Sequence, residues 1–131
     1  MRHPAAGIVA AVDVVVEVGD WEHECCGEAI ERNQLVDFRC IRYTGPDGRT
    51  RLAESHHGGL DVRADARVQG RVAWIELVRE DGTTQPILRV PRGEALRGFD
   101  RDDDGHLEDP WTGDVITSES RDFLVTVRTS L

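Results

Sequence analysis

The chain has 131 residues, of which 25 are acidic and 16 basic, so its formal net charge is −9. This balance opposes a protein that binds nucleic acid or an anionic membrane, because both partners require a basic surface. The length suits a single domain over residues 1–131. No apolar run approaches the ~20 residues that a membrane-spanning helix needs.

Residues of alternating polarity predict the first two strands. The segment from Ile8 to Val18 places valines at every second position, with Asp13 and Glu17 on the opposite parity. A second strand is expected from Leu35 to Tyr43. Its turn, residues 44–48, contains glycine, proline and aspartate and predicts a hairpin that returns through residues 51–54. The inward side chains of the second strand are expected to be Val36, Phe38 and Cys40.

The clearest alternation runs from Leu60 to Gln69. Gly70 interrupts it, and apolar residues continue to Val78 without strict parity. An isolated glycine in a strand pattern predicts a bulge or a sharp bend. The Asp81-Gly82 pair then predicts a tight hairpin turn and a return through residues 87–90. After an aspartate-rich loop, a final strand is expected from residues 123 to 127.

These elements predict an all-β chain, a small antiparallel barrel or sandwich of the OB-like or SH3-like kind, with long loops and little helix. The acidic connection between the first two strands, residues 19–33, is expected to hold at most one helical turn, at Gly27–Arg32.

The cysteines indicate a reducing compartment. Cys25, Cys26 and Cys40 make an odd count, which does not form a disulfide framework in a chain of this size. The apolar start of the chain is interrupted by Asp13 and Glu17 and lacks the small-residue cleavage site of a signal peptide. We therefore expect a cytoplasmic protein.

The most distinctive string is Asp20-Trp21, three residues, then Cys25-Cys26-Gly27. Together with the loop His57-Gly58-Gly59 and the strand Gly70-Arg71-Val72, it resembles a small family of uncharacterised bacterial proteins, a domain of unknown function found mostly in high-GC bacteria. The resemblance covers most of the chain up to about Val78, and it is weaker in the last strand. It implies no activity, substrate or ligand.

Thiolate and imidazole side chains in two loops indicate a zinc-type site. Cys25, Cys26, His57 and either His23 or His56 would supply the four ligands that zinc prefers. The adjacent position of the cysteines opposes this, since structural sites usually space them by two to four residues. One buried and one exposed cysteine is the simpler interpretation. The third interpretation is a reactive thiol, either in a vicinal disulfide or as the nucleophile of a Cys–His pair. The neighbouring glutamates oppose this, because they would raise the pKa of the thiol.

An aspartate tract provides half of a calcium motif. Asp100, Asp102 and Asp104, followed by Gly105, match the start of a calcium loop, but the twelfth position holds Trp111 where glutamate is needed. A solvated acidic turn explains the same residues.

Two tryptophans in loops, Trp21 and Trp111, are candidate ligand-binding residues. The alternative is a structural role, in which their side chains cover an open end of the barrel. Trp74 lies in a strand and is expected to be buried.

The sequence favours a non-catalytic module that binds an unidentified protein or small ligand, and neither nucleic acid nor membrane. A zinc-binding protein that uses the Cys25-Cys26 and His56-His57 loops is the alternative, and a thiol-dependent enzyme is the second alternative. The candidate cofactors are zinc at those loops and calcium at the aspartate tract.

Overall fold

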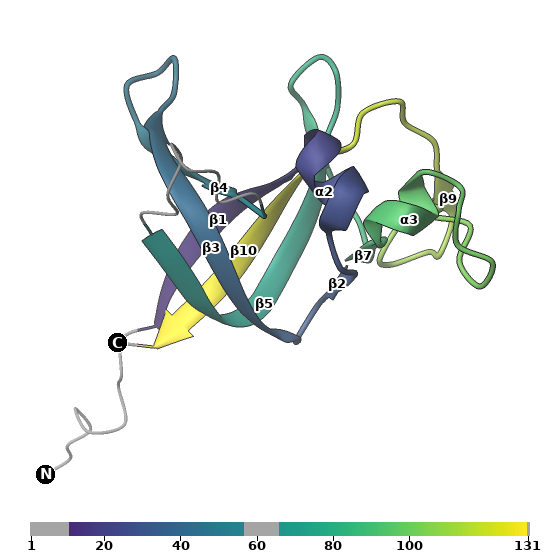
Figure 1. Cartoon of the computed structure of the whole chain (residues 1–131), viewed down its shortest axis with the longest axis horizontal. Helices are drawn as coiled ribbons and strands as arrows, with labels where there is room; N and C mark the ends of the chain where they lie inside the picture. The colour runs from purple at the N-terminus through teal and green to yellow at the C-terminus, as the bar shows by residue number, and fades with distance from the viewer. Residues whose placement is uncertain (1–10, 57–65, 131) are drawn as a thin grey trace, which may run out of the picture.

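A computed structural model describes residues 11–56 and 66–130, except the side chains of Asp20, Trp21 and Ser130. Within these ranges, five strands close into a barrel (Figure 1). They follow the ring order β10, β1, β4, β3, β5, and β5 pairs with β10 to complete the ring. Their bounds are β1 (Ala11–Gly19), β3 (Leu35–Thr44), β4 (Thr50–Glu54), β5 (Ala66–Val78) and β10 (Asp122–Ser130).

The pairings confirm the small all-β barrel that the sequence predicts. All neighbours in the ring are antiparallel except β1 and β4, which run parallel through Val16 and Glu17. A short extra strand, β6 (Thr84–Pro86), forms the hairpin at Asp81-Gly82 and pairs with the end of β5. Residues 8–10 and 60–65 of the expected strands lie outside the described part of the chain.

Period-two alternation places the core inside the barrel, because successive side chains of a strand point to opposite faces. Val12, on the inward parity of β1, is nevertheless 41% exposed. At that end β1 has β10 as its neighbour, while its pairing with β4 is confined to Val16 and Glu17. The buried residues from the five barrel strands are Val16, Val18, Phe38, Cys40, Val68, Val72, Ile75, Leu77, Phe123, Val125 and Val127.

Gly70 lies where β5 passes from one neighbour to the next. Residues 66–71 pair with β3, and residues 71–78 pair with β10. A Cβ at Gly70 would stand 2.3 Å from the carbonyl oxygen of Arg128 on β10. Beyond it, Val72 and Trp74 face consecutive residues of β10, which leaves Ala73 as a bulge. The bend is thus a close backbone approach with a bulge three residues later.

The expected helical turn at Gly27–Arg32 is wrong. The helix is α2 (Asp20–Cys26), which follows β1 directly and ends at Gly27, whose backbone is extended. Residues Ile30–Glu31 instead form β2, paired with β7 (Arg89–Val90). The buried Ile30–Val90 pair joins segments sixty residues apart along the chain, a contact that local sequence does not display.

The expected return strand at residues 87–90 is wrong, because β5 pairs with residues 84–86 while Arg89–Val90 pair with β2. The segment between β6 and β10, expected to be loop-like after Pro91, carries short elements beside one end of the barrel (Figure 1). They are β7, α3 (Gly93–Leu96), β8 (Leu107–Glu108) and β9 (Val115–Ile116). Four of its apolar side chains, Ile87, Val90, Leu107 and Ile116, join the same core cluster as the barrel residues. No helix in the described ranges is long and apolar enough to span a membrane.

An ion pair joins β7 to the aspartate tract within this segment. The Arg89 guanidinium donates to both carboxylate oxygens of Asp103, at 2.5 and 2.7 Å. This pairing, with a hydrogen bond from the Gly105 amide, lowers the pKa of Asp103 from 3.8 to about 2. A carboxylate with a depressed pKa stabilises the fold above its unfolded pKa, and that stabilisation is lost as pH falls through the folded value.

Replacing Asp103 with asparagine is therefore expected to lower the free energy of unfolding by about 1–2 kcal/mol at neutral pH. The difference from the wild type should shrink below pH 3.8 and vanish only below about pH 2, where the carboxyl is protonated in both states. Urea denaturation of both proteins over this range measures it. Asp102→Asn, at an exposed neighbour, is the control. An equal loss at both ends of the range would contradict the ion-pair account.

Candidate functional site

A groove of about 760 Å³ is lined by residues of β1, β4 and β10, together with Tyr43 of β3 and residues of the β5–β6 hairpin. We call it the barrel groove. Val15, Leu52 and Leu124 provide apolar lining, and Tyr43 adds an aromatic ring. Val15 and Tyr43 remain 48% and 39% exposed, so the groove presents apolar surface to solvent.

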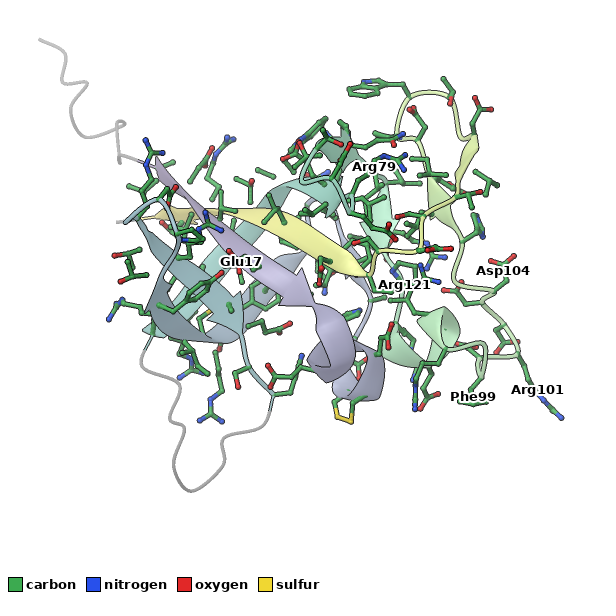
Figure 2. The ribbon with its side chains drawn as sticks, turned by 90° about the horizontal axis from the view of Figure 1, so that it is seen from above. Glu17, Arg79, Phe99, Arg101, Asp104 and Arg121 are labelled. Carbon is green, nitrogen blue, oxygen red and sulfur yellow. A yellow bond between two sulfur atoms is a disulfide. The ribbon has the colours of Figure 1, made fainter. Side chains whose placement is uncertain are left out.

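Acidic side chains dominate the charge of the barrel groove. Glu17, Glu22, Glu54 and Asp122 line it, against the single arginine Arg51. Glu17, labelled in Figure 2, projects from β1. Its carboxylate accepts a hydrogen bond from the Tyr43 hydroxyl and lies 3.9 Å from Arg51. Partial burial and the Glu17 carboxylate both raise the pKa of Tyr43, so this phenol stays protonated as a donor.

A second group of polar side chains lies between α2 and the end of β4. His23, Glu54 and His56 each place one ligand atom within 4.8 Å of the others. His56 Nε2 is 3.2 Å from a Glu54 oxygen. Glu54 lines both the barrel groove and a neighbouring hollow of about 480 Å³, which also includes His56. The three residues are called the His–Glu cluster below.

Burial sets the charge states within the His–Glu cluster. Burial lowers the pKa of His23 against the opposing effect of its hydrogen bond to the Pro91 carbonyl, so this imidazole is neutral near pH 7. Burial also raises the pKa of Glu54, while the adjacent His56 acts in the opposite direction. The imidazole of His23 is 1% exposed.

Two of the predicted zinc ligands are joined to each other in the structure. Cys25 and Cys26 are exposed and joined to each other by a disulfide, drawn as the yellow bond in Figure 2. His57 lies outside the described residues. His23 and His56 do come together, with Glu54 as the third member. In the oxidised state the two sulfurs are not thiolates, the form in which cysteine binds zinc.

The aspartates proposed for calcium are engaged within their own loop, which lies far from Glu17 (Figure 2). An Asp100 oxygen accepts from the Asp102 amide at 2.9 Å, and Asp100 also faces Arg92 at 3.5 Å. Asp104 accepts from the ring of His106, whose pKa is raised by hydrogen bonds to Glu108 and Asp104. These contacts are those of acidic turns, and calcium binding at this tract stays a prediction.

Of the two candidate tryptophans, the structure describes the side chain of Trp111 and not that of Trp21. Trp111 is 70% exposed, and its ring lies 5.7 Å from that of Trp74. The Arg32 guanidinium stands 5.2 Å above Trp74. Trp74 is half-buried, not buried as expected, because its side of β5 meets the segment that carries Trp111 and not the barrel core.

Tyr43, Arg51 and Glu54 are site residues that no sequence motif indicated. Tyr43 and Arg51 are directly opposed across the β3–β4 hairpin, so correct strand pairing would have placed them together. Glu54 closes the same hairpin just before His56. The proximity of Glu54 to His23 depends on the parallel contact between β1 and β4, which no local sequence pattern indicates.

The fold and the groove define a small closed β-barrel protein with an acidic, partly apolar surface groove. The chain belongs to the Family of unknown function (DUF6578), whose model matches residues 10–129. This agrees with the predicted resemblance to a domain of unknown function. No curated protein and no solved structure matches the chain.

Proposed function

We propose that this protein is a non-catalytic binding module whose ligand-binding surface is the barrel groove. The observation that carries the proposal is the composition of the groove: exposed apolar side chains beside four acidic residues and one arginine. Such a surface complements a ligand that combines apolar and positively charged groups, and it repels phosphate backbones. A basic and apolar segment of a protein fits both features.

The order of neighbouring strands supports the position of the site. An OB barrel is a five-stranded Greek-key barrel that binds ligands on the face of its second and third strands. Here the long, bent β5 and then β10 and β1 take the places of the first three strands, and the parallel β1–β4 pair follows. The barrel groove lies on the face of β10 and β1. This is an analogy of fold, and the ligand is inferred from the groove itself.

The predicted alternatives have less support. A thiol-dependent enzyme needs a thiolate with a lowered pKa, whereas Cys25 and Cys26 are joined to each other and Cys40 is buried. Zinc binding through Cys25, Cys26, His57 and His23 would require that the disulfide be reduced first.

We propose a cytoplasmic location in a high-GC bacterium, on the basis of the composition and the resemblance described above.

Binding of two short fluorescein-labelled peptides tests the proposal. One contains arginine and leucine, and the other has glutamate in place of arginine. By fluorescence anisotropy, the basic peptide should bind and the acidic one should not. The double variant Glu17→Gln/Asp122→Asn is expected to weaken binding of the basic peptide about 5-fold, since partly exposed charge contacts contribute up to about 1 kcal/mol.

The matched control is Asp102→Asn/Glu119→Gln, which removes two exposed acids outside the groove. It should leave the affinity within twofold of the wild type after the ionic strength is raised to screen net charge. Equal losses in the two double variants would show that only net charge matters and would overturn the groove as the site. Failure of both peptides to bind would overturn the basic-ligand proposal.

A further inference from the structure

The His–Glu cluster contains the donor types of a transition-metal site. Its two imidazoles and one carboxylate come from three places, α2, the end of β4 and the residue pair after it. In the described ranges this is the one group of three or more metal-ligating side chains with donor atoms within 4.8 Å of one another. Two histidines and a glutamate are the protein ligands of several zinc sites that leave a position open to water.

The hydrogen bonds of His23 leave one ring nitrogen ready to coordinate. Nε2 lies 2.7 Å from the carbonyl oxygen of Pro91. A carbonyl oxygen can only accept a hydrogen bond, so Nε2 is the donor and carries the hydrogen. Nδ1 therefore has an unprotonated lone pair. That atom is buried and has no hydrogen-bond partner. A metal-bound histidine characteristically donates its other ring N–H to a carbonyl or carboxylate, as Nε2 does here.

The glycine after the cysteine pair does not block this lone pair. A Cβ at Gly27 would stand 2.0 Å from Nδ1 of His23, 2.5 Å from Cε1 and 2.6 Å from Cγ. A point along the in-plane lone pair would lie clearly farther from both carbons, so these short distances place the Cβ position over the face of the ring. Gly27 thus packs against the imidazole face, while the in-plane direction of the Nδ1 lone pair is left to other neighbours.

Glu22 holds the other side of the cluster in place. Its Oε1 accepts hydrogen bonds from the Ser55 hydroxyl at 3.2 Å and from the His56 amide at 3.3 Å. These bonds tie the two residues after Glu54 to the helix that carries His23. Outer hydrogen bonds of this kind orient metal ligands and are a usual part of metal sites.

We propose that His23, through Nδ1, together with Glu54 and His56 binds a divalent transition-metal ion of the zinc type, with the remaining coordination completed by water. Ligand atoms around tetrahedral zinc lie about 3.4 Å apart, given bonds near 2.1 Å. The ligand atoms of the cluster now lie within 4.8 Å of one another, so metal binding requires a contraction by rotation of these side chains. The site uses neither cysteine and does not depend on a ligand in the barrel groove.

Titration of the metal-free, full-length protein with Zn²⁺ and Co²⁺ tests this site. We expect one ion per chain by calorimetry, and Co²⁺ absorption bands of a four- or five-coordinate site without thiolate-to-metal charge transfer. His56→Ala and Glu54→Gln should each weaken binding by more than about 10-fold, since loss of even an outer-shell partner has that effect. His56 and Glu54 lie outside the hydrophobic core cluster, so both variants are expected to fold.

Two matched controls complete the experiment. His106→Ala removes an imidazole that lies outside the cluster, and Cys25→Ser/Cys26→Ser removes both paired sulfurs. Both should bind the ions like the wild type. The proposal is overturned if the wild type binds neither ion, if His56→Ala and Glu54→Gln bind them unchanged, or if the cysteine variant loses binding. Peptide binding by the groove is measured separately, so either proposal can fail without the other.

Discussion

Replacing Phe123 with alanine is expected to lower the free energy of unfolding by about 3–5 kcal/mol, the usual cost of removing a fully buried aromatic side chain. Phe123 is the largest of the fully buried side chains in the described ranges. It lies on β10 opposite Leu77 and Val18, and its ring meets the edge of the His23 imidazole at a centroid distance of 6.2 Å. The cavity would therefore open where barrel and helix meet.

Urea denaturation followed by far-ultraviolet circular dichroism measures this loss. Phe99→Ala is the matched control, because Phe99 is 72% exposed and its removal should change stability by no more than about 0.5 kcal/mol. If Phe123→Ala is too unstable to handle, Phe123→Leu should show a smaller loss of the same sign. Similar stabilities for the alanine variants at positions 123 and 99 would contradict the arrangement of the core.

The second large effect is expected for Gly70→Ala, at about 2–3 kcal/mol of destabilisation. The new methyl group would stand 2.3 Å from the Arg128 carbonyl oxygen and 3.0 Å from a methyl of Val127. The nearest atom belongs to the backbone of β10, so the methyl can be accommodated only by displacing one of the strands that close the barrel. Thermal and urea denaturation measure the change.

Gly113→Ala separates steric crowding from the general effect of replacing a glycine. Gly113 has a φ of 76° and no atom within 4 Å of its hypothetical Cβ. Its substitution should cost about 1 kcal/mol through backbone conformation alone. A Gly70→Ala variant no less stable than Gly113→Ala would refute the close approach of β5 and β10.

Much of the barrel could be predicted because its strands have a buried and an exposed face. The alternation in residues 35–43 predicted the inward side chains Phe38 and Cys40. The turn residues predicted the positions of both hairpin turns, although the strand after the second turn is formed by residues 84–86 and not 87–90. The helix position and the short elements between β6 and β10 could not be predicted in this way. Their apolar residues, such as Ile30 and Val90, are buried by partners distant in sequence, so no local period reveals them.

For the candidate sites too, some features could be predicted from the sequence and others could not. His23 and His56 were recognisable by residue type, because imidazole is a metal ligand wherever it occurs. The sequence could not show that Glu54 joins them while Cys25 and Cys26 bond to each other. Nor could it show that Glu17, Arg51 and Tyr43 share one groove.

The class of fold, the acidic character and the residue types available for binding follow from local periodicity and composition, so they can be predicted from the sequence. Which side chains meet depends on tertiary contacts. The parallel contact of β1 with β4 and the closure of β5 on β10 bring together residues that lie far apart along the chain. Such contacts arise from burial of the whole core, whose free energy is shared among many residues and is encoded at no single position.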